Sequence, residues 1–199
     1  MKTKISVLIL GLGLVFTLGC SKYPPASDRL LEDLAVITQY DTKVNFNNYK
    51  TFSMPDAIMK ITDKDTVAIK NQTAITILNQ VSKNMTSMGY SQVITPVKPD
   101  FAIEVLYYQN TTVYTYNYNW WGYYPYYPYY PVYYASYTTG MGNIELVDLK
   151  VVDDPNKRAP IRWNAFIRGI LNEGHTTAEI TGRIDQAFIQ TPQLKTTAK

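Results

Sequence analysis

Apolar residues recur at steps of four and three residues between positions 74 and 88, which is the spacing of one helical face. The stripe consists of Ala74, Leu78, Val81, Met85 and Met88, and Ile77 widens it. Asp63 or Asp65 can cap the start of such a helix, and Gly89 follows its end, where glycine favours a left-handed backbone. The spacing therefore predicts a helix from about Thr66 to Met88, whose single apolar face must pack against another layer of the fold.

A second helix with one apolar face is predicted near the end of the chain. Thr176 and Glu179 have the spacing of a capping box, in which two residues satisfy each other's backbone N–H groups at a helix start. Pro192 closes this segment because proline cannot continue a helix. The buried stripe consists of Ile180, Ile184, Ala187 and Phe188. Since each helix has a single apolar face, we expect both to cover one face of a sheet.

Short runs rich in β-branched, aromatic and aliphatic residues predict strands. They lie at 34–40, 49–53, 101–108, 144–152 and 161–171. The fourth run alternates between two faces, with Ile144, Leu146 and Asp148 on one and Glu145, Val147 and Leu149 on the other. Residues 153–157 have the composition of a hairpin turn, so the last strands should be antiparallel neighbours.

The elements follow the order strand, strand, helix, three strands and helix. Late strands joined by hairpins favour an antiparallel sheet, and the long helix provides one crossover. We therefore predict the α+β class, as a single domain with a mostly antiparallel sheet, two helices packed on one face, and a Tyr/Pro-rich extended hairpin or loop. The predicted domain covers residues 34–192, the Tyr/Pro-rich arm within it covers 109–140, and residues 193–199 form a flexible C-terminal tail.

Residues 1–19 have the pattern of an export signal peptide. Lys2 and Lys4 give it a positive start, and the uncharged stretch from Ile5 to Leu18 spans 14 residues. As a helix this stretch would reach about 21 Å, which is short of a ~30 Å hydrocarbon core. The stretch is therefore interpreted as part of a signal rather than as a membrane-spanning helix.

Cys20 is the only cysteine in the chain, and it follows this stretch directly after Gly19. The arrangement resembles a bacterial lipobox, in which the cysteine becomes the mature N-terminus and carries acyl chains. The alternative is an ordinary signal with a cysteine near its end by chance. Lipid on Cys20 would anchor the chain stably, because acyl chains contribute ~0.8 kcal/mol per buried CH₂. Residues 20–33 would then be the lipidated N-terminus and tether, and Ser21 at the next position favours the outer membrane, facing the periplasm.

Short motifs along the mature chain resemble those of a known family. They are Tyr40-Asp41, residues 46–52, Gly89-Tyr90, Pro99-Asp100-Phe101, residues 144–148, Arg162-Trp163 and Gly169. In this order and spacing they resemble the domain-of-unknown-function 4136 family of bacterial envelope lipoproteins, over about residues 34–192. The resemblance implies a lipoprotein fold and an envelope compartment. It implies no reaction and no catalytic residue, because that family has no assigned function.

The stretch from Val105 to Ile144 contains no Asp, Glu, Lys or Arg, and it holds 14 of the 18 tyrosines. Its first part alternates aromatic residues with Thr or Asn, which predicts a strand with one aromatic face. In its second part, Pro125, Pro128 and Pro131 recur every three residues, which is the period of polyproline II. Because prolines lack the N–H donor that a sheet needs, this part is predicted to be a loop or tip.

The aromatic arm is a candidate binding surface, because tyrosine and tryptophan combine a flat apolar face with a polar group. Such side chains suit a protein partner, a glycan or a membrane interface. The alternative interpretation is a low-complexity insertion or a private cover for the sheet edge. Nucleic acid is not expected, since no basic residue is interleaved with the aromatic ones. The candidate residues are Tyr114, Tyr116, Tyr118, Trp120, Trp121, Tyr126, Tyr127, Tyr129 and Tyr130.

The sequence offers little of the chemistry that enzymes use. His175 is the only histidine, and its place between Gly174 and a helix start is typical of an exposed loop residue. One cysteine and one histidine cannot form a metal site built on several such ligands. A Gly-x-Ser-x-Gly elbow and a Walker-type loop are both missing from the sequence. We therefore predict no catalytic residue, no metal and no cofactor.

The function predicted from the sequence is that of a membrane-anchored envelope lipoprotein acting as a non-catalytic binding or scaffold module. Its expected partners are the membrane, through the N-terminal lipid, and an envelope protein or glycan, through the aromatic arm. The alternative is a peptidoglycan- or glycan-binding lipoprotein that uses the Tyr/Trp arm. Removal of Lys2 and Lys4 with the signal lowers the formal net charge from +3 to about +1, a balance that does not indicate nucleic acid as a partner.

Overall fold

The computed structural model describes residues 35–62, 65–94, 97–109, 113–115, 134–136, 140–151, 159–172 and 174–197. They belong to one compact unit, Asp33–Lys199. Among the helices of this described part, none is long and apolar enough to cross a membrane. The predicted signal at 1–19, Cys20 and the turn predicted at 153–157 lie outside the described residues.

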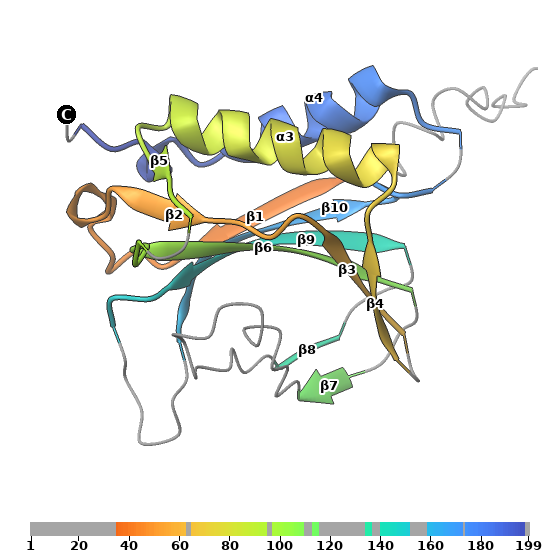
Figure 1. Cartoon of the computed structure of the whole chain (residues 1–199), viewed down its shortest axis with the longest axis horizontal. Helices are drawn as coiled ribbons and strands as arrows, with labels where there is room; N and C mark the ends of the chain where they lie inside the picture. Colours follow the sequence, from red (N-terminus) through yellow and green to blue (C-terminus); the bar gives the residue numbers. More distant parts are fainter. Residues whose placement is uncertain are drawn as a thin grey trace, which may run out of the picture. The chain divides into compact units, whose positions relative to one another are not determined.

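An eight-stranded sheet forms the centre of the domain, and two helices cover one of its faces (Figure 1). The main path runs β1-β10-β9-β6-β2-β5, with β3 beside β6 and β4 beside β3. The strands of this sheet are β1 (Val36–Tyr40), β2 (Thr51–Ser53), β3 (Ile58–Ile61), β4 (Thr66–Ile69), β5 (Ser91–Gln92), β6 (Phe101–Tyr108), β9 (Met141–Asp148) and β10 (Ile161–Arg168). The helices are α3 (Gln72–Ser87) and α4 (Thr177–Ile189), with short 3₁₀ turns η2 (Phe46–Asn48) and η4 (Pro192–Leu194). β7 (Val113–Thr115) and β8 (Tyr134–Ser136) form a separate antiparallel pair.

The structure confirms the predicted α+β class and corrects the direction of some strands. β1, β10, β9 and β6 pair antiparallel, as predicted. β2 instead runs parallel to both β5 and β6, and β3 runs parallel to β6. The parallel pairs arise because the chain crosses over through α3 before it returns to the sheet. The sheet is therefore mixed: most of its pairings are antiparallel, as predicted, and the three that involve β2 with β5, β2 with β6 and β3 with β6 are parallel.

Helix α3 begins later than the sequence predicted. Residues Thr66–Ile69 form β4, which pairs antiparallel with β3. The cap is Asn71 rather than Asp63 or Asp65, and its side chain accepts a hydrogen bond from the Ala74 backbone N at 2.9 Å. Four residues such as Thr66–Ile69 are too few to distinguish a strand from the first turn of a helix. Their pairing with β3 makes this segment a strand.

The predicted apolar stripes of both helices are confirmed, and together with one face of the sheet they form the main core. The buried residues of α3 include Ala74, Ile77, Leu78, Val81 and Met85. Those of α4 are Ile180, Ile184, Ala187 and Phe188, behind the predicted capping box of Thr176 and Glu179. Trp163 of β10 lies in this core, where its indole N donates to Thr191 Oγ1 at 3.0 Å.

The C-terminal segment, predicted to be a flexible tail from residue 193, packs on the domain as far as the structure describes it. Leu194 is fully buried, and its backbone oxygen accepts a hydrogen bond from the Tyr90 hydroxyl at 2.8 Å. Thr196 N donates to Met88 O at 2.9 Å, and Thr197 N donates to Asn47 Oδ1 at 2.8 Å. The prediction failed because it used Pro192 only as a helix stop and ignored the apolar Leu194 beyond it.

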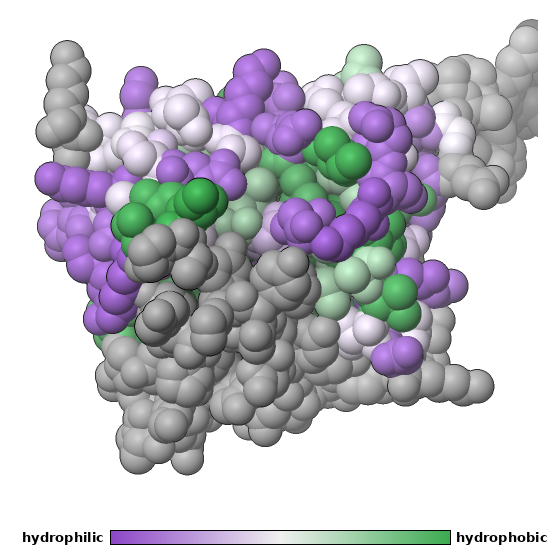
Figure 2. Space-filling view, viewed as in Figure 1, coloured by the Kyte–Doolittle hydropathy of each residue, from purple (hydrophilic) through white to green (hydrophobic). Residues whose placement is uncertain are grey.

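Hydrophobic side chains on the outside of the domain lie in small groups separated by hydrophilic ones on the face that Figure 2 shows. The exposed large apolar residues of the described chain are Ile37, Tyr40, Val67, Ile75, Ile94, Val97, Val151 and Ile189. They come from different elements of the fold. Single exposed apolar residues are ordinary on soluble domains, so the functional site has to be sought by its chemistry.

Candidate functional site

The motif residues in the first half of the chain meet around the start of β6. Tyr49 stacks on Phe101, with ring centroids 4.0 Å apart and ring planes 11° apart. Asp100 Oδ2 accepts hydrogen bonds from Lys50 N at 2.7 Å and Thr51 N at 3.1 Å. These contacts join the chain before β2 to the start of β6, and they explain the motifs as determinants of the fold.

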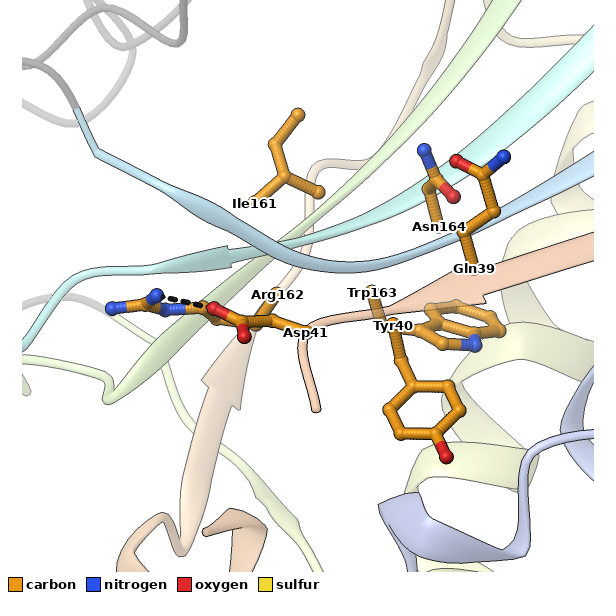
Figure 3. Close-up of a pocket in the computed structure, with 7 residues that line it drawn as sticks. All are labelled: Gln39, Tyr40, Asp41, Ile161, Arg162, Trp163 and Asn164. Atoms are coloured by element: carbon orange, nitrogen blue, oxygen red, sulfur yellow. Dashed lines mark hydrogen bonds and ion pairs between the residues drawn. The ribbon is translucent and has the colours of Figure 1, made fainter. Parts of the chain in front are cut away.

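Asp148, at the end of β9, forms a polar network with three other motif residues, Tyr49, Arg162 and Asp41. Its Oδ2 accepts hydrogen bonds from the Tyr49 hydroxyl at 2.7 Å and from Arg162 Nε at 2.9 Å. Arg162 Nη1 also donates to Asp41 Oδ2 at 2.8 Å, the pair drawn with a dashed line in Figure 3. A backbone hydrogen bond from Lys43, aided by Arg162, holds the pKa of Asp41 below its usual value. Burial, together with Asp148, raises the pKa of Tyr49.

An open pocket of about 340 Å³ lies where β1 ends and β10 begins, beside this network. Its lining comes from both strands: Gln39, Tyr40, Asp41, Ile161, Arg162, Trp163 and Asn164. Figure 3 shows that Gln39 and Asn164 point to one side of the two-strand ladder, whereas Tyr40 and Trp163 point to the other. Because its one cation is already paired with two carboxylates, the pocket has no free charge for a ligand.

A row of polar side chains crosses the sheet on the face away from the helices. In the β-sheet register, Glu104 of β6 lies opposite Glu145 of β9, Glu145 lies opposite Asn164 of β10, and Asn164 lies opposite Gln39 of β1. Directly opposite residues of antiparallel strands have their Cβ atoms ~5 Å apart on the same face. We call these four residues the acceptor row; Asn143 lies beside it, and its Nδ2 donates to Glu145 Oε1.

The acceptor row separates two apolar clusters on the same face of the sheet. One cluster contains Ala102, Val147, Leu149 and Ala159, with Ile161 packed against it. The other contains Met59, Ile61, Leu106 and Tyr108, with Met141 and Phe166 packed against it. Strand alternation produces this pattern, because the even-numbered residues of β6 and the odd-numbered residues of β9 share the face. The face therefore combines hydrogen-bonding groups with flanking apolar surface.

Several acceptor atoms of this face are buried without a donor. Oε1 of Glu104 and Oδ1 of both Asn143 and Asn164 accept no hydrogen bond from any residue that the structure describes. Glu104 is only 3% exposed and Asn143 is fully buried. Burial raises the pKa of Glu104 to about 8, so that the group holds its proton at neutral pH. A buried polar atom left without a partner costs ~1–3 kcal/mol, and native domains contain few of them.

The carboxylates and the single histidine do not converge on one catalytic centre within the described residues. Glu104 lies on the face away from the helices, whereas Asp148 bonds to Tyr49, whose ring packs in the core beneath the helices. His175 precedes α4. The described part of the chain also holds no group of three or more His, Cys, Asp or Glu residues that could bind a metal ion.

The site residues predicted from the sequence fall mostly outside the described structure. Cys20 does so, as do Tyr116, Tyr118, Trp120, Trp121, Tyr126, Tyr127, Tyr129 and Tyr130. Tyr114 lies in β7, which pairs with β8 in the register Tyr114 to Ala135. The arm therefore begins and ends in an antiparallel pair, and its two ends continue from β6 and into β9.

The sequence did not predict the acceptor row as a site. Its one visible signal was the alternation around Glu145, which placed a carboxylate on the face opposite Ile144 and Leu146. Residues 39, 104, 145 and 164 are far apart in sequence, and only the register of four strands aligns them. A charged residue such as Glu104 inside an otherwise apolar strand was the clue that could have pointed to this face.

Comparison with known proteins places the chain in a family. The model of a domain of unknown function, DUF4136, matches residues 36–193, so the chain belongs to the DUF4136 family. This finding confirms the resemblance drawn from the motifs, most of which the contacts described above explain as parts of the fold.

The solved structures similar to this chain include the following two. One is the crystal structure of a DUF4136 family protein from Bacteroides thetaiotaomicron, with a TM-score of 0.64 and 30% identity, covering 82% of this chain and 98% of that one. The other is a PDZ domain protein from Parabacteroides distasonis, with a TM-score of 0.44 and 17% identity, covering 83% of this chain and 36% of that one. The second likeness is too weak to support an argument. A search of curated proteins found no match.

Proposed function

We propose that this chain is a lipid-anchored protein of the bacterial cell envelope whose folded domain is a non-catalytic binding module. The anchor is proposed from the sequence: a 14-residue apolar stretch ends at Gly19 and the only cysteine, Cys20. Strand β1 starts at Val36, so a tether of about 15 residues would separate the lipid from the domain. Such a tether reaches at most ~50 Å when extended, enough to hold the domain close to its membrane.

The observation that carries the binding role is the set of buried acceptor atoms without donors on the helix-free face of the sheet. A ligand for this face would supply donors to Glu104, Asn143 and Asn164, and would place apolar surface on the clusters that flank the acceptor row. Hydroxyl, amide and ammonium groups are the donors available in biological ligands. A polar strip between apolar surfaces is the pattern that binding sites commonly present.

The candidate partners remain an envelope protein or a glycan, with the aromatic arm as the second part of the interface. The arm connects β6 to β9, the two strands that carry Glu104 and Glu145. The glycan alternative draws on the same two features, because sugars stack on aromatic rings and donate hydroxyl hydrogen bonds. Peptidoglycan is the glycan that the proposed compartment would offer.

The anchor is tested by metabolic labelling with a fatty acid. Cells producing the full-length chain should incorporate the label, and cells producing Cys20→Ser should not. Since Cys20 is the only thiol in the sequence, no other cysteine can take up the label. Equal labelling of both chains would show that the protein is not a lipoprotein of this type.

The binding role is tested by co-sedimentation of the full-length chain with purified peptidoglycan and by cross-linking in native envelopes. We would compare Glu104→Leu, which removes an acceptor, with replacement of residues 113–134 by a short turn, which removes the arm. Asp56→Asn is the matched control, because this exposed acid pairs only with exposed Lys70. Sedimentation lost in the first two variants and retained in Asp56→Asn would favour the glycan.

A single cross-linked protein partner that is lost in the same two variants would favour the envelope protein instead. Unchanged behaviour of Glu104→Leu in both assays would contradict a binding role for the acceptor row. Because lipid labelling is measured separately, failure of the binding role and failure of the anchor can be told apart.

A further inference from the structure

Strand β1 is an edge strand that carries none of the usual protection against pairing. Among the described strands it pairs with β10 alone. Its sequence, Val-Ile-Thr-Gln-Tyr, contains no charged residue and no proline. Natural sheets protect their edges with charges, prolines, bulges or very short strands, because an open edge is a template for another strand. The edge strand β5 follows this rule, since it has only two residues.

The hydrogen-bond register shows which groups the open edge offers. Arg168 N donates to Ala35 O at 3.0 Å, and Asp41 N donates to Arg162 O at 2.8 Å. Bonded and non-bonded pairs alternate along an antiparallel ladder, so Ile37 and Gln39 also direct their backbone groups at β10. Val36, Thr38 and Tyr40 therefore direct their N–H and C=O groups away from β10, toward the open edge.

The side chains of β1 are accessible as well. Ile37 is 55% exposed and Tyr40 is 38% exposed, so two large apolar residues of a five-residue strand face solvent. Gln39 is also exposed. Both the backbone and the side chains of this edge are thus available to an added strand, which is the arrangement used in β-strand addition.

We propose that β1 pairs antiparallel with β1 of a second copy of this chain, about a two-fold axis at Thr38. In this register Thr38 lies opposite Thr38, and Val36 lies opposite Tyr40 of the other copy. The outward-facing residues then form about six backbone hydrogen bonds, two for each bonded pair. The result is one continuous sheet that crosses both copies.

The self-match of the strand favours a second copy over an unrelated partner. Threonine opposite threonine, and an aromatic residue opposite a β-branched one, are both favourable cross-strand pairs. A symmetric pairing repeats any charge of the strand on the neighbouring copy, so like charges would lie near one another, and β1 has none. The acid that follows the strand, Asp41, is already paired with Arg162.

Disulfide trapping tests the register directly in the full-length chain. In the proposed dimer the two Cα atoms of residue 38 are ~5.5 Å apart, within the range of a disulfide, so Thr38→Cys should cross-link under mild oxidation. Gln39→Cys is the matched control, because residue 39 would lie opposite residue 37, and two residues at 39 would be about 8 Å apart. The parent chain is a second control, because any disulfide that it forms must involve Cys20, its only cysteine.

We expect the cross-linked fraction of Thr38→Cys to exceed that of Gln39→Cys several-fold. We also expect sedimentation of the parent chain in detergent to show a dimer whose fraction rises with protein concentration. Thr38→Pro removes an N–H that faces the open edge, so it should abolish the dimer and leave the ladder to β10 in place. Cross-linking of Thr38→Cys no stronger than that of Gln39→Cys would overturn the proposal, and so would a parent chain that stays monomeric at every concentration. Trapping at residue 38 remains decisive if Thr38→Pro fails to fold.

Discussion

At the scale of single residues, the buried polar groups of the domain are of two kinds: some bond to one another, and others have acceptor atoms without a partner among the described residues. Asp148, Arg162, Tyr49 and Asp41 satisfy one another and join β1, β9 and β10 to the chain before β2. Glu104 and Asn143 lie buried on the other face with acceptor atoms that no described residue satisfies. The first group stabilises the domain, and the second group destabilises it as long as its acceptor atoms lack a donor.

The Asp148 network should be important for stability. Replacing fully buried Asp148 by Asn removes the charge that pairs with Arg162, whose side chain is only 18% exposed. Breaking a buried pair by removing one partner costs ~3–5 kcal/mol, and we expect the lower part of that range because Asp41 still pairs with Arg162. Denaturant unfolding measures the loss. A loss below about 0.5 kcal/mol would mean that the network contributes no more than an exposed ion pair.

The raised pKa of Glu104 predicts a pH dependence of stability. The folded chain holds this proton up to a pKa of about 8, whereas the unfolded chain releases it near the ordinary value of 4.5. Between these values the folded state binds more protons, so the free energy of unfolding should fall as the pH rises from about 5 to about 8. Glu104→Gln should remove this slope, which unfolding curves at several pH values would reveal. An unchanged slope in the variant would contradict the assignment.

At the scale of elements, local signals predicted what local interactions determine. The capping box of Thr176 and Glu179 was readable because its two residues lie within one helical turn. The stripe of α4 was readable because its spacing alone marks the apolar face of a helix. The start of α3 was not readable, because β4 exists through its pairing with β3. The parallel pairing of β2 with β6 joins residues that are 49 positions apart in sequence. The acceptor row depends on the alignment of four strands. A single sequence does not contain the register of such pairings.

The capping box predicts a measurable contribution of α4 to stability. Thr176 Oγ1 accepts a hydrogen bond from Glu179 N at 3.2 Å, and Glu179 Oε2 accepts one from Thr176 N at 2.7 Å. Thr176→Ala should reduce stability by ~1 kcal/mol, which lowers the melting midpoint by about 2–4 °C in a domain of this size. Thr176→Ser, which keeps the hydroxyl, is the matched control. Equal melting of the alanine variant and the parent chain would show that the cap does not stabilise α4.

At the scale of the whole molecule, the described domain is a two-layer α+β structure with helices on one face of its sheet and the acceptor row on the other. The three apolar clusters that the structure describes consist of residues outside the arm. The structure thus separates a stable scaffold from the surfaces proposed for binding: the acceptor row, the arm and the edge of β1.

The arm should be dispensable for folding. Replacing Val113 to Tyr134 by a short Gly-containing turn removes few aliphatic side chains, and loop-closure entropy changes slowly with length. We expect the melting midpoint to stay within a few degrees of the parent value in a thermal scan, because ~1 kcal/mol shifts it by about 2–4 °C. An insoluble product, or one without a cooperative transition, would mean that the arm is structural.

The central claim is that the acceptor row is a binding site. The most direct test is the free energy of unfolding of the full-length Glu104→Leu chain, measured by denaturant titration at neutral pH without ligand. If Glu104 is a buried acceptor kept for a ligand, an apolar side chain of similar size should raise the stability by ~1–3 kcal/mol, the cost of the unsatisfied group. Asn143→Leu should not share this gain fully, because Asn143 also donates to Glu145. A Glu104→Leu chain less stable than the parent would show that Glu104 is a structural partner within the domain, and the binding face would lose its basis.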